Sequence, residues 1–133
     1  MTNEIYRRTT RAIEVAVRPI YLEDQSEPDR RQFTWAYQVR IENRGTETVQ
    51  LRMRHWRITD ASGHVDTVDG PGVVGEEPVL RPGEHHDYVS GVTLTTPSGS
   101  MGGTYDMETP GGERFPVEIP TFLLVSPHKR LLH

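Results

Sequence analysis

The feature that most constrains this chain is a strict alternation of apolar and polar positions that recurs in short segments. Across residues 33–41 the large apolar side chains are Phe33, Trp35, Tyr37, Val39 and Ile41, and the residues between them are polar or alanine. A period of two places these five side chains on one face of an extended strand. Apolar spacings of three and four, which indicate an amphipathic helix, are absent. The chain is therefore predicted to consist of half-buried strands.

The same alternation, bounded by glycine and proline, predicts further strands. They lie within residues 11–18, 49–58, 65–68, 88–94, 101–107 and 115–124. Pro19 is expected to interrupt strand pairing, and shifts in the apolar phase predict a β-bulge near His55 and a bend or bulge after Pro120. About seven short strands with turns between them predict an all-β fold, a sandwich of two antiparallel sheets of immunoglobulin-like or fibronectin type III-like form.

Length and composition limit the class of protein further. A chain of 133 residues predicts one domain, residues 1–133, with a core at about 12–125 and short flexible tails at both ends. The absence of cysteine excludes disulfides, thiolate metal sites and a cysteine nucleophile. No apolar stretch is long enough to span a membrane, and the polar first ten residues lack a signal-peptide core. We therefore expect a soluble cytoplasmic protein without membrane partners.

The net charge of −4 is unevenly distributed along the chain. Residues 1–57 carry eleven arginines against eight acidic residues, whereas residues 58–113 carry Arg81 alone against ten. Nucleic-acid binding depends on a net basic surface, so the acidic balance argues against a nucleic-acid partner. The acidic middle third would also repel any anion brought to it.

One short motif matches a known ligand-binding pattern. Gly70, Gly72 and Gly75 fit the G-x-G-x-x-G pattern of phosphate-binding loops, and Arg81 is the basic residue nearest in sequence. The motif needs a helix beginning in the loop, and Pro78 and Pro82 prevent one, so a Rossmann fold is excluded. The simpler interpretation is that these glycines permit positive φ angles and close backbone approach.

Catalytic and metal-binding constellations are not evident. His55, His64, His85 and His86 lie in or beside the acidic third, but adjacent His85 and His86 would point to opposite faces of a strand. His64 and Asp66 can share a face, but two ligands do not make a metal site. No serine occupies a nucleophile elbow, and no carboxylate pair has an environment that separates two pKa values. We therefore expect no enzyme activity, no bound metal and no cofactor.

The outward positions of two strands form the second candidate site. Arg40 lies on one predicted strand, and Arg52, Arg54 and Arg57 lie on the next. If the two strands pair, these arginines make a basic stripe that can bind an acidic partner protein through bidentate contacts. The simpler interpretation is a solvated sheet face balanced by Glu42 and Glu47. Both interpretations remain open at this point.

Several short segments together resemble one protein family, the ApaG domain of bacteria. They lie at residues 25–26, 33–43, 55–60, 68–76, 80–83, 88–91 and 101–107, within a region of about 12–125. The resemblance implies a fibronectin type III-like sandwich without a defining catalytic activity. It also implies an association with cobalt resistance and magnesium efflux. Related domains in eukaryotes occur in an F-box protein and a DNA polymerase δ-interacting protein, which implies use as a protein-binding module.

Two hypotheses for function follow. The first is a non-enzymatic module that binds an unidentified protein, acting as a monomer or weak homodimer, with a link to cobalt and magnesium homeostasis implied by the resemblance. The second is a small-ligand binding protein. It would hold pyrophosphate or a nucleotide at Gly70, Gly72 and Gly75, which the family resemblance also implies, or a divalent cation at the acidic middle third.

Overall fold

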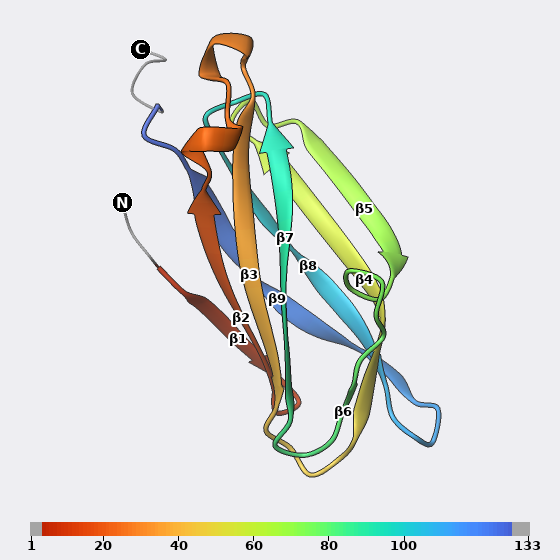
Figure 1. The fold of residues 1–133 in the computed structure, drawn as a ribbon. Helices are drawn as coiled ribbons and strands as arrows, with labels where there is room; N and C mark the ends of the chain where they lie inside the picture. Colours follow the sequence, from red (N-terminus) through yellow and green to blue (C-terminus); the bar gives the residue numbers. More distant parts are fainter. Residues whose placement is uncertain (1–3, 129–133) are drawn as a thin grey trace.

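The computed structural model describes residues 4–128 and shows an all-β sandwich of two antiparallel sheets (Figure 1). The first sheet has four strands in the order β1-β2-β3-β7, and the second has five, β5-β4-β8-β9 with the short β6 paired to β4. The strands are β1 (Tyr6–Thr10), β2 (Ile13–Tyr21), β3 (Phe33–Asn43), β4 (Val49–Asp60), β5 (Val65–Pro71), β6 (Val79–Leu80), β7 (His85–Leu94), β8 (Ser98–Glu108) and β9 (Arg114–Val125). Two short 3₁₀ helices, Glu23–Gln25 and Pro28–Arg30, join β2 to β3.

The predicted fold class is confirmed, and each predicted strand is present. Two strands were not predicted, because the polar segment Tyr6–Thr10 and the two-residue β6 show no apolar alternation of their own. The described region contains no helix long and apolar enough to cross a membrane.

Pro19 does not interrupt the sheet, so that expectation was wrong. β2 continues to Tyr21, and Pro19 stays in register with Tyr37. The Leu22 N–H donates to the Thr34 carbonyl, so even-numbered residues of this segment hydrogen-bond to β3. The donor that proline lacks therefore faces the other side of β2, beyond the point where β1 begins opposite Val17.

Both predicted irregularities are present as register shifts, but the first lies elsewhere. The register of β4 against β8 shifts between Leu51 and Met53, earlier than the predicted position near His55. The shift opposite Pro120 lies where the sequence predicts it, between Met101 and Gly103 of β8. Because the first bulge comes early, Arg54 faces the same side as its buried cross-strand partner Tyr105. That side is the interior of the sandwich.

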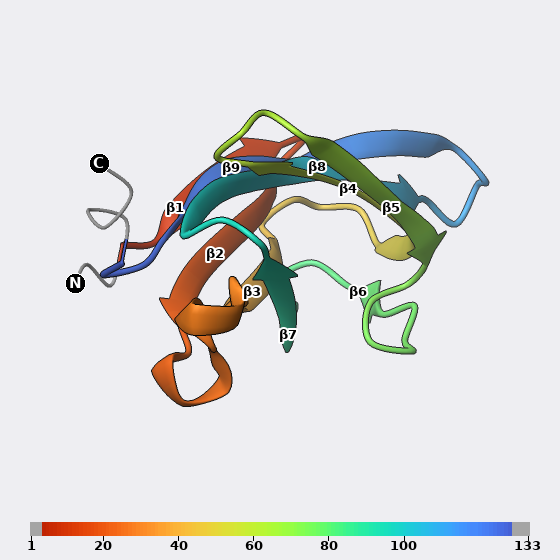
Figure 2. The same cartoon turned by 90° about the horizontal axis from the view of Figure 1, so that it is seen from above.

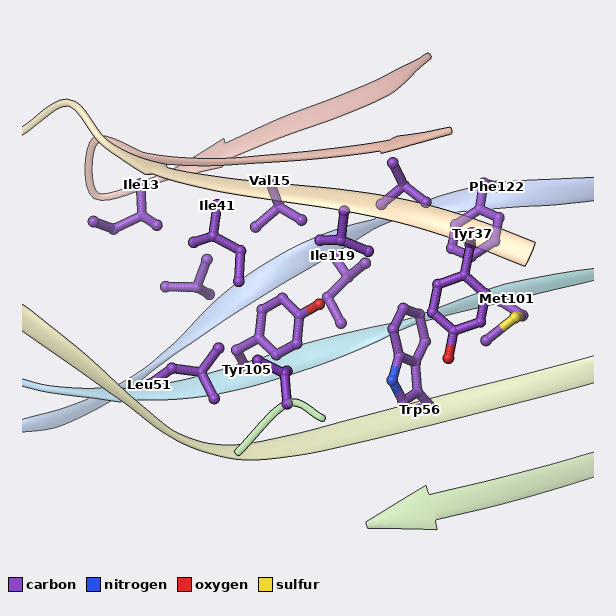
Figure 3. Close-up of a cluster of buried hydrophobic side chains, with 14 of the residues drawn as sticks. Ile13, Val15, Tyr37, Ile41, Leu51, Trp56, Met101, Tyr105, Ile119 and Phe122 are labelled. Atoms are coloured by element: carbon purple, nitrogen blue, oxygen red, sulfur yellow. The ribbon is translucent and has the colours of Figure 1, made fainter. Parts of the chain in front are cut away.

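The core lies between the inner faces of the two sheets (Figure 3). Trp56 packs within it, with its ring centroid 5.3 Å from that of Tyr37 and 6.0 Å from that of Phe122. Trp35 is also buried, and its indole N–H donates to the Val125 carbonyl at 3.0 Å, so it ties the first sheet to the second. The sandwich is closed along one side, where β1 and β2 lie against β9 (Figure 2).

Candidate functional site

The glycine motif forms a tight hairpin turn. Val73 and Glu76 form an isolated bridge with two mutual backbone hydrogen bonds, 2.8 and 3.0 Å, around the central residues Val74 and Gly75. These central residues have φ angles of 48° and 80°, as a type I′ turn requires. Gly72 also has a positive φ, and a Cβ there would lie 2.2 Å from the Glu76 carbonyl oxygen. The expected positive φ is thus confirmed at Gly72 and Gly75.

Three backbone N–H groups of this loop donate to carbonyls within the protein. The N–H of Gly72 donates to the Arg52 carbonyl, and those of Val73 and Glu76 donate to each other's carbonyls. The Arg54 guanidinium donates from Nη1 to the carbonyls of Pro71 and Gly72 at 2.9 and 3.1 Å. The carbonyls of Pro71 and Gly72 therefore face a cation, the Arg54 guanidinium. A pyrophosphate site would instead direct backbone N–H groups at an anion.

The fourth residue of the predicted ligand site lies apart from the loop. Arg81 follows β6, which pairs with Val49 and Gln50, whereas the glycine loop adjoins Arg52 and Arg54. Its backbone N–H donates to the Glu84 carboxylate, and within residues 4–128 no hydrogen bond or ion pair joins its side chain to the loop. Ligand binding by Gly70, Gly72, Gly75 and Arg81 stays a prediction.

The four arginines predicted to form one stripe lie on different surfaces. Arg40 is on β3 and the other three are on β4, and these strands belong to different sheets. Arg40 lies on the outer face of the first sheet and Arg57 on the outer face of the second, while the early bulge turns Arg54 inward. Arg52 is held by Glu77 at 3.1 Å and by Glu108 at 3.7 Å. The premise of one stripe was wrong because the chain crosses between sheets after Asn43.

A different basic surface exists on the outer face of the four-stranded sheet. It is an open groove of about 510 Å³, which we call the arginine groove. Its lining includes Arg7, Arg18, Arg40, Ala16, Gln38 and Val89. Ala16 sits between Arg7 and Arg40 in the register of three adjacent strands, so a small side chain leaves the centre of the face hollow.

The three arginines of the groove differ in their hydrogen-bond and ion-pair partners. Arg40 forms a bidentate pair with Asp87 at 2.8 and 3.1 Å, and Arg7 lies 3.6 Å from Glu14. Arg18 donates from Nε and Nη2 to the Gln38 amide oxygen at 3.0 and 2.7 Å, and no carboxylate of residues 4–128 pairs with it. The charge of Arg18 is therefore oriented but not neutralised.

The outer face of the second sheet carries an Asp-His-Asp cluster. His55 lies 2.6 Å from Asp69 through Nδ1 and 2.9 Å from Asp106 through Nε2. Hydrogen bonds to these two carboxylates, with the larger effect from the one to Asp106, raise the pKa of His55 above its usual 6.5. The cluster joins β4, β5 and β8, so sequence spacing alone does not reveal it.

The other histidines are placed as the sequence predicts. His64 lies 3.1 Å from Asp66, and His85 and His86 alternate along β7. Within the described part of the chain, no three His, Asp or Glu side chains are arranged to hold a metal ion.

A tyrosine pair lies between the sheets, with Tyr105 fully buried and Tyr88 half-buried. The hydroxyls of Tyr88 on β7 and Tyr105 on β8 hydrogen-bond to each other. Burial raises the pKa of both phenols, and the nearby Arg54 opposes that shift. The pair is therefore neutral at physiological pH and joins the two sheets at their more open side.

The fold defines the class of this protein, the two-sheet antiparallel β-sandwiches of immunoglobulin-like or fibronectin type III-like form. Comparison with known proteins then identifies the family within this class. The family model of the ApaG domain matches residues 23–109. The chain belongs to the ApaG domain family.

Relatives and solved structures of this family are similar to this chain over nearly its whole length. Protein ApaG of Parvibaculum lavamentivorans is 61% identical over 130 residues, 97% of this chain and 100% of the relative. Protein ApaG of Rhodospirillum centenum is 62% identical over 126 residues, 95% of this chain and 97% of the relative. The crystal structure of the putative ApaA protein from Bordetella pertussis is 44% identical, with a TM-score of 0.83, and covers 92% of this chain and 96% of its own.

Proposed function

We propose that this chain is a cytoplasmic, non-catalytic protein-binding module that receives an acidic segment of its partner in the arginine groove. The observation that carries the proposal is Arg18, whose guanidinium is oriented by Gln38 at the floor of an open groove and lacks a carboxylate partner within the described residues. Guanidinium groups held in place bind carboxylates in bidentate geometry at a low entropic cost.

The surroundings of Arg18 also favour a protein over a small anion. Ile5 and Val89, both exposed, border the groove and offer apolar contact beside the charges. Such a combination of an apolar border and polar anchors is typical of protein interfaces. The glycine-loop alternative has less support, because three loop N–H groups donate within the protein. The association with cobalt and magnesium homeostasis stays a prediction from the family resemblance.

Photo-crosslinking in living cells tests this function. A photoreactive phenylalanine analogue placed at Ile5, on the border of the groove, leaves the contact between Arg18 and Gln38 intact and should give one discrete adduct with another protein. The same analogue at Arg57, on the outer face of the second sheet, serves as the control. Adding Arg18→Glu should reduce the Ile5 adduct at least tenfold, because the charge reversal repels an acidic segment. No adduct from Ile5, or equal adducts from both positions, would contradict the proposal.

A further inference from the structure

The edge of β7 presents unused backbone hydrogen-bonding groups. The Asn43 N–H donates to the Glu84 carbonyl, which sets the phase of the β3–β7 ladder. By the alternation of an antiparallel pair, the backbone groups of Tyr88, Ser90 and Val92 bond to β3. Those of Val89, Gly91 and Thr93 therefore point away from β3, where the sheet ends. Within residues 4–128 no strand pairs with this side of β7.

The sequence of β7 does not protect this edge. Residues 88–94 contain no charged side chain and no proline, and Val89 is exposed. In contrast, the edge strand β5 of the other sheet contains Asp66, Asp69 and Pro71, which discourage strand pairing. On the far side of the sandwich, β1 lies against β9 and both are covered. β7 is thus the long unprotected edge of the described structure.

The second sheet extends beyond β7 and forms a backing for an added strand. Val68 on β5 is the cross-strand partner of Trp56, so both side chains lie on the inner face. Trp56 is 4% exposed, yet Val68 is 40% exposed. The inner face at β5 is therefore not covered by β7, and Figure 1 shows β5 diverging to one side of it. A strand added to β7 would lie over Val68 and cover it.

We propose that β7 accepts a single extended segment of a partner protein as an added antiparallel strand, completing the sandwich over β5. This inference rests on the proposed function, since the occupant is part of a protein partner. Main-chain hydrogen bonds would supply the affinity, and alternate side chains the specificity.

The surroundings of the edge define the chemistry of the guest. On the outer face of the sheet, side chains of the added strand would lie beside Asp87, Val89 and Gly91. These positions favour a basic, an apolar and a large aromatic side chain respectively. Inward guest residues would cover Val68 with apolar side chains, and an acidic one near Tyr88 would approach the Arg54 guanidinium.

A second copy of this chain fits the edge less well than a single strand. Two β7 strands pairing antiparallel are related by a two-fold axis perpendicular to the sheet, which places both second sheets on the same side of the joined sheet. Each β5 already extends past its own β7 into that space. The two overhanging strands would collide, so the guest is expected to be a segment without a covering sheet.

A designed peptide provides a direct test. The sequence Thr-Val-Tyr-Val-Val-Glu-Lys, aligned antiparallel to β7 from Thr93 to Asp87, satisfies the positions above. Amide hydrogen exchange at saturating, millimolar peptide should slow at least tenfold at Val89, Gly91 and Thr93. Ser90 and Val92 already donate to β3 and should change little. This alternating pattern is specific to strand addition.

Two variants at one position separate backbone from side-chain effects. Val89→Pro removes an N–H that faces the open edge but does not bond to β3, so binding should weaken at least tenfold while the fold is retained. Val89→Thr keeps that N–H and should bind within threefold of the wild type. If Val89→Pro does not fold, the exchange pattern of the wild type decides the question.

Three results would overturn the proposal: no binding at millimolar peptide, protection without alternation, or a dimer through β7 in sedimentation without peptide. The arginine groove is tested separately, because Arg18→Glu should remove the Ile5 adduct in cells without abolishing the alternating protection at β7. If the peptide does not slow amide exchange at β7 but the crosslinked adducts still form, only the proposal for the β7 edge is rejected.

Discussion

At the scale of single residues, His55 is the side chain whose charge state the fold controls most directly. Asp106 and Asp69 both accept hydrogen bonds from the imidazolium form, so the pKa of His55 is raised above 6.5 in the folded state. A group with a raised folded pKa contributes its full stability below its unfolded pKa. That contribution is lost as the pH rises through the folded pKa.

The NMR titration of the His55 ring should therefore give a pKa above 6.5, and Asp106→Asn should lower it. His55→Gln should destabilise the protein more at pH 6 than at pH 9, measured as the free energy of unfolding in urea. An equal effect at both pH values would show that the carboxylates do not stabilise the protonated ring.

At the scale of elements, substitutions in the glycine loop after β5 test whether its glycines are structural. Gly72 and Gly75 have similar φ angles, 62° and 80°, but a Cβ at Gly72 meets the Glu76 carbonyl and one at Gly75 meets nothing within 4 Å. Gly75→Ala should cost about 1 kcal/mol from backbone strain alone. Gly72→Ala should cost on the order of 3 kcal/mol more, because the loop must also move. Thermal unfolding of the pair measures the difference, and equal costs would contradict the assigned contact.

The alternation of side chains predicted the strands at this scale but not which strands share a sheet. Phe33–Ile41 is central as expected, because β2 and β7 pair with its two edges and its apolar face packs against the second sheet. The short connection after Asn43 has the length of a hairpin turn, yet the chain crosses to the other sheet there. The arginine groove was not foreseen for the same reason: it depends on β1, a polar strand without apolar alternation, lying beside β2. The His55 cluster likewise depends on the pairing of three strands.

At the scale of the whole molecule, Asn43 is a polar connection between the sheets. It is fully buried at the end of β3, where its Nδ2 donates to the carbonyls of Glu47 and Leu80 and its Oδ1 accepts from the Gly45 N–H. Asn43→Ala removes three hydrogen bonds and should destabilise the protein by about 3 kcal/mol at about 1 kcal/mol each. Chemical denaturation measures this cost. A loss below about 1 kcal/mol would mean that the connection between the sheets does not depend on Asn43.

The placement of the two tryptophans has a spectroscopic consequence. Trp35 belongs to the first sheet but bonds to Val125 on the second, and Trp56 belongs to the second sheet but packs against Tyr37 on the first. Both indoles therefore sense the distance between the sheets more than the order within either one. Intrinsic fluorescence in this protein would report separation of the two layers, even where circular dichroism still records intact strands.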